Sequence, residues 1–406
     1  MSEQKGFNRW LIVVGALLVQ LCLGAVYAWS VFRKPLEAEL GITPTQATLP
    51  FSFVLIFFAL ATVLGGRIQD RFGPRAGAIM GGILLGVGMI LSSLAQSVTA
   101  LILSYGVISG IGIGFAYVCP ISAGVKWFPD KRGLITGLAV AGFGAGALIV
   151  GPLAARLIGT AGVFPTFRYL GIAYVVVVIL GALILRNPPA GYRPAGWTPP
   201  QPAAGVAARI DYTTAQMLGT SQFWLIWILY FIGAGSGLMI IGQTSPIAQE
   251  LGRYSKATAA LGVSVLAIFN ALGRILWGRL SDSIGRTRTL FFIYLINGLA
   301  VLSYFLIPAM PFWFWIGIAL VGATFGGYLA IYPAMTTDFY GTKSIGINYG
   351  MVFTAYGVGG LLGNLLAPLV KQATNNYNLA FILSGVLCLA ASVVIHFVKA
   401  PRARAA

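Results

Sequence analysis

One basic residue lies inside a long apolar stretch of this chain, and it has the clearest chemical use. Arg274 occurs in Leu261–Gly285, whose first two-thirds are rich in glycine, alanine and larger apolar residues and predict a membrane helix. A charge at the centre of a bilayer costs about 2.5–3.5 kcal/mol on insertion scales, so it needs a reason to be there. Asn270 lies one helical turn earlier on the same face. A guanidinium can hold a carboxylate with two parallel hydrogen bonds, so this pair predicts a site for a small organic anion.

Arg274 also has a structural alternative. It lies a few residues from the predicted end of its helix, where a long side chain can reach the membrane interface. Asn270 could orient Arg274 or donate to an anion, or it could form an ordinary interhelical hydrogen bond. We place the other Lys, Arg, Asp and Glu residues at helix ends and in loops, which leaves Arg274 as the single charge expected within a span.

The composition indicates an integral membrane protein. Of the 406 residues, 58% are hydrophobic and 9% are charged, whereas a soluble domain carries about 25% charged residues. The formal net charge of +17 would suggest nucleic acid in a soluble protein, but here the basic residues gather in short loops, as the positive-inside rule describes. Cys22, Cys119 and Cys388 lie far apart in apolar segments and form neither a metal motif nor a disulfide framework.

Apolar stretches long enough to cross a bilayer occur twelve times, which predicts an all-α membrane protein. We place them near residues 10–32, 47–66, 76–97, 99–121, 133–157, 167–186, 221–249, 257–279, 288–308, 311–337, 345–370 and 378–398. The segment between the sixth and seventh is rich in Pro, Gly and Ala and predicts a flexible linker. The predicted units are a six-helix bundle at 1–186, a cytoplasmic linker at 187–220 and a second six-helix bundle at 221–406.

The distribution of Lys and Arg predicts which loops face the cytoplasm. Basic residues concentrate in the loops that lie on the same side as both termini. We therefore expect both termini to be cytoplasmic and the protein to be a multi-pass protein of the cell membrane, plasma or inner.

A short motif occurs once in each predicted half. Gly66-Arg-Ile-Gln-Asp-Arg-Phe-Gly73 recurs as Gly278-Arg-Leu-Ser-Asp-Ser-Ile-Gly285, and the segment Gly137–Gly144 recurs weakly as Gly350–Gly357. Six helices per repeat keep the same orientation in the membrane, so the halves form a parallel repeat related by a pseudo-two-fold axis. This arrangement favours alternating access to a site between the halves.

The repeated motif resembles the loop motif of the major facilitator superfamily. The resemblance implies that fold and a role in gating for its glycines and charged residues, with helix capping on a solvated loop as the simpler alternative. The residues concerned are Gly66, Asp70, Arg71 and Gly73 in the first half and Gly278, Asp282 and Gly285 in the second.

A narrower resemblance covers nearly the whole chain. Gly24–Ser30 (GAVYAWS) resembles the start of monocarboxylate transporters and of the oxalate–formate antiporter, and Lys126–Gly133 (KWFPDKRG) resembles the antiporter. Phe269-Asn270-x-x-Gly273-Arg274 and Asn348-Tyr349-Gly350 continue the match. The resemblance implies that Arg274 binds substrate and that Tyr27, Tyr117 and Phe143 line the pocket.

The departures from these families narrow the expected substrate. Tyr356 stands where the antiporter has a second substrate-binding lysine, and one arginine neutralises one carboxylate. We therefore expect a monocarboxylate such as lactate or pyruvate rather than oxalate. Monocarboxylate transporters have an Asp at the position of Asn270 and a lysine in the first helix, which is absent between Gln20 and Ser30. Proton symport is implied by the resemblance, without an evident proton-carrying carboxylate in the membrane.

Further tyrosines are candidates for the same cavity. Tyr328 and Tyr332 lie one turn apart, and Tyr356 faces the same way as Asn364; packing or an interfacial belt is the alternative role. His396, the single histidine, and Asp338 fall at inner helix ends, where we expect structural roles.

These observations predict a secondary active transporter of small monocarboxylates that works by alternating access, with proton symport as the implied coupling. The alternatives are an anion exchanger of the oxalate–formate type and, from a different class, a receptor that does not transport. The sequence lacks the motifs of an ATP-driven pump or hydrolase, so we do not expect an enzyme. We expect a small organic anion, a proton and the lipid bilayer as partners, no cofactor, metal or nucleic acid, and a monomer.

Overall fold

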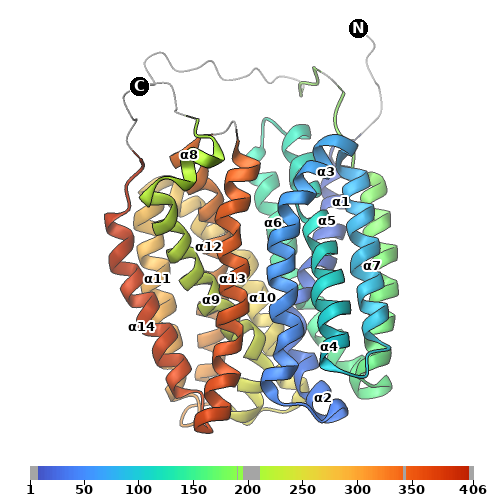
Figure 1. Ribbon diagram of the computed structural model, residues 1–406, viewed down its shortest axis with the longest axis vertical. Coiled ribbons are helices and arrows are strands. Elements are labelled where there is room, and N and C mark those ends of the chain that lie inside the picture. The colour runs from blue at the N-terminus through green and yellow to red at the C-terminus, as the bar shows by residue number, and fades with distance from the viewer. Residues whose placement is uncertain (1–7, 190, 195–210, 342–343, 402–406) are drawn as a thin grey trace.

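The described part of the chain is helical throughout. The computed structural model describes residues 8–189, 191–194, 211–341 and 344–401, and these residues contain no strand. Twelve helices within them are long and apolar enough to cross a membrane, six before the segment at 187–220 and six after it. The predicted fold class, an all-α membrane protein with twelve spans, is confirmed. Figure 1 shows the helices as a bundle of roughly upright rods, some in front of others.

The first six spans are built from seven α-helices and two short helical segments. They are α1 (Trp10–Gly24), the 3₁₀ turn η1 (Ala25–Ala28), α2 (Trp29–Leu40), α3 (Pro44–Ser92), α4 (Val98–Leu101), the π-helical η2 (Ile102–Ser109), α5 (Gly110–Trp127), α6 (Arg132–Ala161) and α7 (Val163–Ile184).

The second six spans follow a short helix that precedes them. The elements are α8 (Thr214–Leu218), α9 (Ser221–Glu250), α10 (Lys256–Ile284), α11 (Arg286–Leu302), η3 (Ser303–Leu306), α12 (Trp313–Tyr340), α13 (Ile345–Thr374), α14 (Asn378–Val394) and η4 (Ile395–Phe397).

Part of the predicted linker differs from the expectation of a flexible segment. Its last described residues form α8, which a Thr213–Gln216 capping box begins, and Met217 is fully buried. The backbone N–H of Tyr212 donates to the carbonyl of Tyr340, and the Asn348 amide donates to the carbonyl of Tyr212. This stretch therefore packs against the helices of the second half. Residues 190 and 195–210 of the linker lie outside the described residues.

The first span is broken at the segment GAVYAWS. The α-helix ends at Gly24, a 3₁₀ turn carries Tyr27, and α2 begins at Trp29. A Cβ atom at Gly24 would lie 1.7 Å from the carbonyl oxygen of Phe143 on α6. Glycine therefore allows the two backbones to touch, and this contact brings the ring of Tyr27 to that of Phe143.

The last glycine of the repeated motif has similar backbone angles in both halves. Gly73 has φ 84° and ψ 166° and separates two spans within α3, while Gly285 has φ 93° and ψ 155° and separates α10 from α11. These angles lie in a region that is open to glycine and costly for other residues. The motif glycines thus set the sharp turn between consecutive spans in each half.

The two halves meet along two pairs of helices. α10 packs against α6, and α13 packs against α3. Figure 1 shows that α1 begins and α14 ends at the same end of the bundle, where α8 also lies, and that α2 reaches the opposite end. We call these ends the terminal face and the distal face.

Close packing of α12 against α10 positions Arg274. A Cβ atom at Gly326 would lie 2.2 Å from the carbonyl oxygen of Asn270, and one at Gly273 would lie 2.1 Å from that of Ala323. The glycines on each helix therefore let the other backbone approach, and a larger residue must separate the two helices.

We predict that Gly326→Ala lowers the thermal stability of the purified protein by an amount equivalent to about 1–3 kcal/mol, because the added methyl group has no room. Gly159→Ala is the matched control, since a Cβ atom there meets nothing within 4 Å. Tryptophan fluorescence during heating in detergent measures both variants. Equal melting temperatures for the two would contradict the close packing.

Candidate anion-binding site

Arg274 lies inside the protein between the two halves. Its side chain is 3% exposed, and its Nη1 donates to the carbonyl of Val140 on α6 at 2.7 Å. Its Nε donates to Oδ1 of Asn270 at 3.1 Å. The buried position and the contact with the first half differ from the alternative in which the side chain reaches the membrane interface.

Two donors of this pair have no hydrogen-bond partner among the described residues. They are Nη2 of Arg274 and Nδ2 of Asn270, and both are buried. An unsatisfied buried donor costs about 1–3 kcal/mol, more when it is charged. The two donors come from side chains that already touch each other, so one carboxylate can accept from both. In this conformation Nη1 of the guanidinium is bonded to Val140, which leaves Nη2 as its free terminal donor. The second donor that a bound anion would find is Nδ2 of Asn270.

Aromatic residues of the first half surround the guanidinium. Arg274 lies over the ring of Phe143 with its Cζ 5.7 Å from the ring centroid. Phe143 in turn contacts Tyr27 and Tyr117 edge-on, with centroids 5.4 and 5.2 Å away. The charge of Arg274 acts on the hydroxyl groups of both tyrosines. The structure therefore brings Tyr27, Tyr117 and Phe143 together with Arg274, as the sequence predicts.

Tyr356 reaches the same group from the second half. Its hydroxyl lies 3.0 Å from that of Tyr27, and Arg274 acts on it electrostatically. The position to which the resemblance assigns a second cation is thus occupied by a phenol that bonds across the halves.

Several aromatic residues of this shell were missed by the sequence reasoning. Phe58 contacts Tyr117, Phe143, Phe353 and Tyr356 with centroids 5.2 to 5.9 Å apart. Phe325 packs edge-on against Tyr27, and the charge of Arg274 acts on Tyr349. Phe58, Phe325 and Phe353 carry no polar group, so in the sequence they resemble ordinary core residues. Tyr349 lies in the quoted Asn348-Tyr349-Gly350 segment, which was the available signal.

Tyr328 and Tyr332 belong to a different cluster. The Tyr332 hydroxyl lies 2.8 Å from that of Tyr294, its ring stacks on Tyr230 at 4.1 Å, and Tyr328 packs against Tyr294. These partners lie on α9 and α11, within the second half. Tyr230 links the cluster to Phe353 at 6.4 Å. A role for Tyr328 and Tyr332 in lining the substrate cavity stays a prediction.

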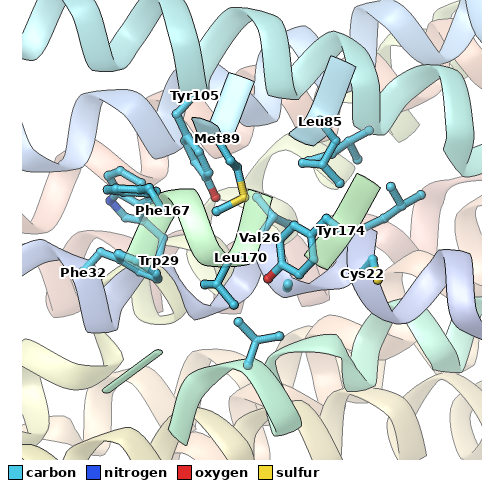
Figure 2. Close-up of a pocket in the computed structure, with 14 residues that line it drawn as sticks. Cys22, Val26, Trp29, Phe32, Leu85, Met89, Tyr105, Phe167, Leu170 and Tyr174 are labelled. Atoms are coloured by element: carbon cyan, nitrogen blue, oxygen red, sulfur yellow. The ribbon is translucent and has the colours of Figure 1, made fainter. Parts of the chain in front are cut away.

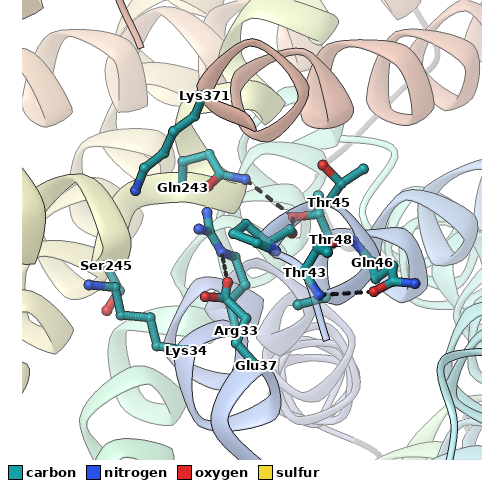
Figure 3. Close-up of polar contacts among 12 residues, drawn as sticks. Arg33, Lys34, Glu37, Thr43, Thr45, Gln46, Thr48, Gln243, Ser245 and Lys371 are labelled. Atoms are coloured by element: carbon teal, nitrogen blue, oxygen red, sulfur yellow. Dashed lines mark hydrogen bonds and ion pairs between the residues drawn. The ribbon is translucent and has the colours of Figure 1, made fainter. Parts of the chain in front are cut away.

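Polar contacts join the halves from Arg274 to the distal face. Asn364 Nδ2 donates to Ser52 Oγ at 3.0 Å, and Gln243 Nε2 donates to Thr48 Oγ1 at 3.4 Å, the latter drawn in Figure 3. Thr45 Oγ1 donates to Gln372 Oε1 at 2.7 Å. Each bond pairs a residue of α3 with one of α9 or α13, so this path is closed in the observed conformation.

An ionic contact completes this closure. Glu250, at the end of α9, pairs with Lys34 of α2 at 3.2 Å and with Lys371 of α13. The hydroxyl of Tyr377 also donates to Glu250 at 2.9 Å. We call Lys34, Glu250 and Lys371 the distal latch, because this group holds the two halves together at that face.

A second buried arginine lies toward the distal end of the first span, where the sequence predicts an ordinary helix-end charge. The first span continues to Leu40, and Arg33 lies inside it with a fully buried side chain. Its Nε donates to Glu37 Oε1 at 2.6 Å. The hydropathy pattern ends before Arg33, so the sequence places this residue at a helix end. In the structure α2 packs against helices of both halves, including α3, α6 and α9, and Arg33 is buried.

The motif residues of the second half bind within that half. Arg286 donates to Asp282 at 2.6 Å and to Asp338 at 3.1 Å, which ties the turn between α10 and α11 to the end of α12. The side chain of Asp70 lies outside what the structure describes. In the first half, Arg71 lies over the ring of Phe72. A Cβ atom at Gly66 would meet nothing within 4 Å, and one at the equivalent Gly278 would meet Ala330 at 3.8 Å.

The segment KWFPDKRG is also fastened within its own half. Arg9 donates two hydrogen bonds to Asp130, at 2.7 and 2.9 Å, and lies over the ring of Phe128. The paired guanidinium holds the pKa of the Asp130 carboxyl below its usual range. This contact joins the start of α1 to the loop between α5 and α6.

A small pocket lies within the first half and is lined by apolar and aromatic side chains. Figure 2 shows Trp29, Met89, Tyr105, Phe167 and Tyr174 around it. It lacks the charge that an anion site requires, so it is separate from the group around Arg274.

The helical architecture and the charged site between two halves direct the comparison with known proteins. The family profile described as "Major Facilitator Superfamily" matches residues 10–364 and 247–406. The chain belongs to the major facilitator superfamily.

Relatives within this superfamily include several transporters. The chain is 31% identical over 354 residues to an uncharacterized MFS-type transporter, YhjX, of Escherichia coli K12. This alignment covers 87% of this chain and 86% of the relative. It is 30% identical over 394 residues to the oxalate:formate antiporter of Oxalobacter formigenes, with 96% and 91% covered. It is 25% identical over 430 residues to monocarboxylate transporter 12 of Rattus norvegicus, with 98% and 87% covered.

Solved structures of the superfamily share the fold. The D-xylose-proton symporter superposes with a TM-score of 0.74 at 16% identity, over 96% of this chain and 98% of that one. A bacterial homologue of the lysosomal transporter Spinster, solved in an inward-facing and unoccupied conformation, gives 0.68 at 17% identity, over 98% and 95%. The protein is therefore a transporter of the superfamily and a multi-pass membrane protein, related to the antiporter and to monocarboxylate transporters.

We predict that Glu250→Gln increases opening at the distal face, because an amide cannot hold Lys34 and Lys371 by charge. The reporter is Ser52→Cys in a background without Cys22, Cys119 and Cys388, labelled by a membrane-impermeant maleimide from the distal side. We expect labelling to accelerate about two- to fivefold, which corresponds to the upper part of the range for a partly exposed ion pair.

Glu39→Gln is the matched control, because Glu39 is an exposed carboxylate on α2. Equal labelling rates in the two variants would show that the distal latch does not hold the halves closed.

Proposed function

We propose that the protein is a secondary active transporter of small monocarboxylates such as lactate or pyruvate, which works by alternating access and binds the substrate carboxylate at Arg274. The observation that carries the proposal is the buried Arg274–Asn270 pair between the halves, with an unpartnered donor on each residue. A carboxylate would satisfy both donors and neutralise the charge.

The surroundings of the pair fit a short acid with one charged end. The shell of Tyr27, Phe58, Tyr117, Phe143 and Phe325 offers apolar faces with a few hydroxyl groups. A small acyl group can pack against these rings while its carboxylate meets the guanidinium. Among the relatives, an apicoplast pyruvate carrier of Toxoplasma gondii is 28% identical over 452 residues, covering 85% of this chain and 81% of the relative.

Exchange of the oxalate–formate type is the second candidate, favoured by the 30% identity to the antiporter. The contact between Tyr356 and Tyr27 argues against a dicarboxylate, because a neutral phenol stands at the position that the resemblance assigns to a second cation. A dianion bound at Arg274 would leave one charge without compensation in a low-dielectric site.

Proton coupling is part of the proposal and rests on the charge of Arg274. One anion and one proton that bind together leave the charge of the loaded carrier equal to that of the empty carrier, so their joint entry carries no net charge across the membrane. The empty carrier can return with Arg274 held by Asn270 and Val140. We further propose that the terminal face is cytoplasmic in the cell membrane and that the protein works as a monomer.

We predict that Arg274→Lys reduces kcat/KM for pyruvate or lactate uptake at least about tenfold, because an ammonium group keeps the charge but cannot hold Asn270, Val140 and the anion together. Uptake into proteoliposomes measures the effect. Arg288→Lys is the control, since Arg288 is exposed on the neighbouring helix α11 and lies outside the repeated motif. Full activity of the Arg274 variant would reject recognition by the guanidinium.

We predict that uptake of lactate into proteoliposomes rises when the outside is made acidic and that it proceeds without a counter-anion inside. Uptake that ignores the pH gradient would count against proton symport. Movement of labelled formate only in exchange for oxalate would favour the second candidate.

A further inference from the structure

We propose that Arg33 is a second carboxylate-binding arginine, placed on the path between the distal face and Arg274. The group consists of Arg33 and Glu37 of α2 together with the distal latch. The anion would bind to this group before or after it binds at Arg274.

The bonding of Arg33 is incomplete in the same way as that of Arg274. The side chain is fully buried, its Nε donates to Glu37 four residues ahead on the same helix, and the Tyr377 hydroxyl lies beside the guanidinium. Both terminal nitrogens, Nη1 and Nη2, are buried and have no partner among the described residues. Arg274 likewise bonds through Nε to a residue four positions away, Asn270, and leaves Nη2 unpartnered. Two unsatisfied nitrogens at the end of a guanidinium form the fork that a carboxylate fits.

The charges of the surrounding group favour one negative charge. Glu37 pairs with Arg33, while Glu250 is shared between Lys34 and Lys371. Three cations therefore face two carboxylates, and a monocarboxylate would bring the group to neutrality. Tyr377 lies close enough to Arg33 and Glu250 to interact with both. Figure 3 shows that Arg33 and Lys34 come from the first half and that Lys371 comes from the second.

The site lies on the route that the substrate must take. Arg33 follows Tyr27 by six residues, which corresponds to about 9 Å along the helix at 1.5 Å per residue. The cross-half bonds Gln243–Thr48 and Asn364–Ser52 connect this level with that of Tyr356, beside Arg274. When these bonds open, the two arginines stand at the two ends of one polar path.

The chemical class of the ligand rests on the proposed function, whereas the existence of the site does not. The experiment therefore separates the two arginines. Saturation-transfer NMR detects weak binding of pyruvate to the full-length protein in detergent micelles, and it requires no transport. The proteins compared are the parent, Arg274→Gln, and Arg274→Gln combined with Arg33→Gln or with Lys256→Gln. Lys256 is an exposed lysine near the distal face and serves as the matched control.

We expect Arg274→Gln to lose the tighter binding and to retain weak pyruvate binding. Adding Arg33→Gln should reduce this remaining binding at least about tenfold, the size expected for a charge-assisted pair, whereas adding Lys256→Gln should leave it unchanged. If Arg33→Gln fails to fold because Glu37 loses its partner, Arg33→Gln with Glu37→Gln removes both charges and takes its place. The melting temperature of each variant without pyruvate reports a purely structural effect.

The proposal is overturned if Arg274→Gln binds no pyruvate, or if its remaining binding survives the loss of Arg33. A lower melting temperature with unchanged binding would leave Arg33 as a structural element of the distal latch, and this also overturns the proposal. If Arg274→Gln keeps the tighter binding, the proposed function fails while the result for Arg33 stands separately.

Discussion

Burial of positive charge between two helical halves is the constraint on which this structure depends. Arg274 and Arg33 are both buried at the contact of the halves, and both keep nitrogens without a partner. In a membrane protein such groups are costly, and they persist where an anion or a change of conformation satisfies them. The remainder of the interface accommodates these charges: aromatic faces and an amide around Arg274, carboxylates around Arg33.

The proposed alternating access requires this interface to open and close. Hydrogen bonds between single polar side chains, such as Asn364–Ser52 and Tyr27–Tyr356, join the halves at successive levels, and Glu250 joins them by charge at the distal face. Each of these contacts is small, so no one of them prevents separation. By contrast, the Arg286 contacts with Asp282 and Asp338 lie within one half, which lets that half move as a unit. Contacts confined to one half, together with small contacts between the halves, fit the proposed rocking of two bodies.

Glycine determines how closely the working helices approach. Gly24 lets the broken first span touch α6 and thereby sets Tyr27 against Phe143, while Gly326 lets α12 touch α10 beside Asn270. The aromatic shell is thus positioned by backbone contacts, and the rings fill the space between the halves. This explains how a site with few polar atoms can be enclosed and still hold a charged residue in a defined place.

The sequence alone determined the twelve spans and the repeated motif and singled out Arg274 and Asn270 as candidate site residues, because hydropathy, spacing and a charge in an apolar stretch are local properties. It also indicated Tyr27, Tyr117, Phe143 and Tyr356, which the structure brings to Arg274. Phe58 and Phe353 were not identifiable, since an apolar ring has the same appearance in a core and in a cavity wall. Tyr328 and Tyr332 lie in a neighbouring cluster that only the packing of α9, α11 and α12 reveals. Whether Arg33 is a helix-end charge or a buried one was decided by the tertiary structure, because α2 packs against helices of both halves, among them α9, which is distant in the chain.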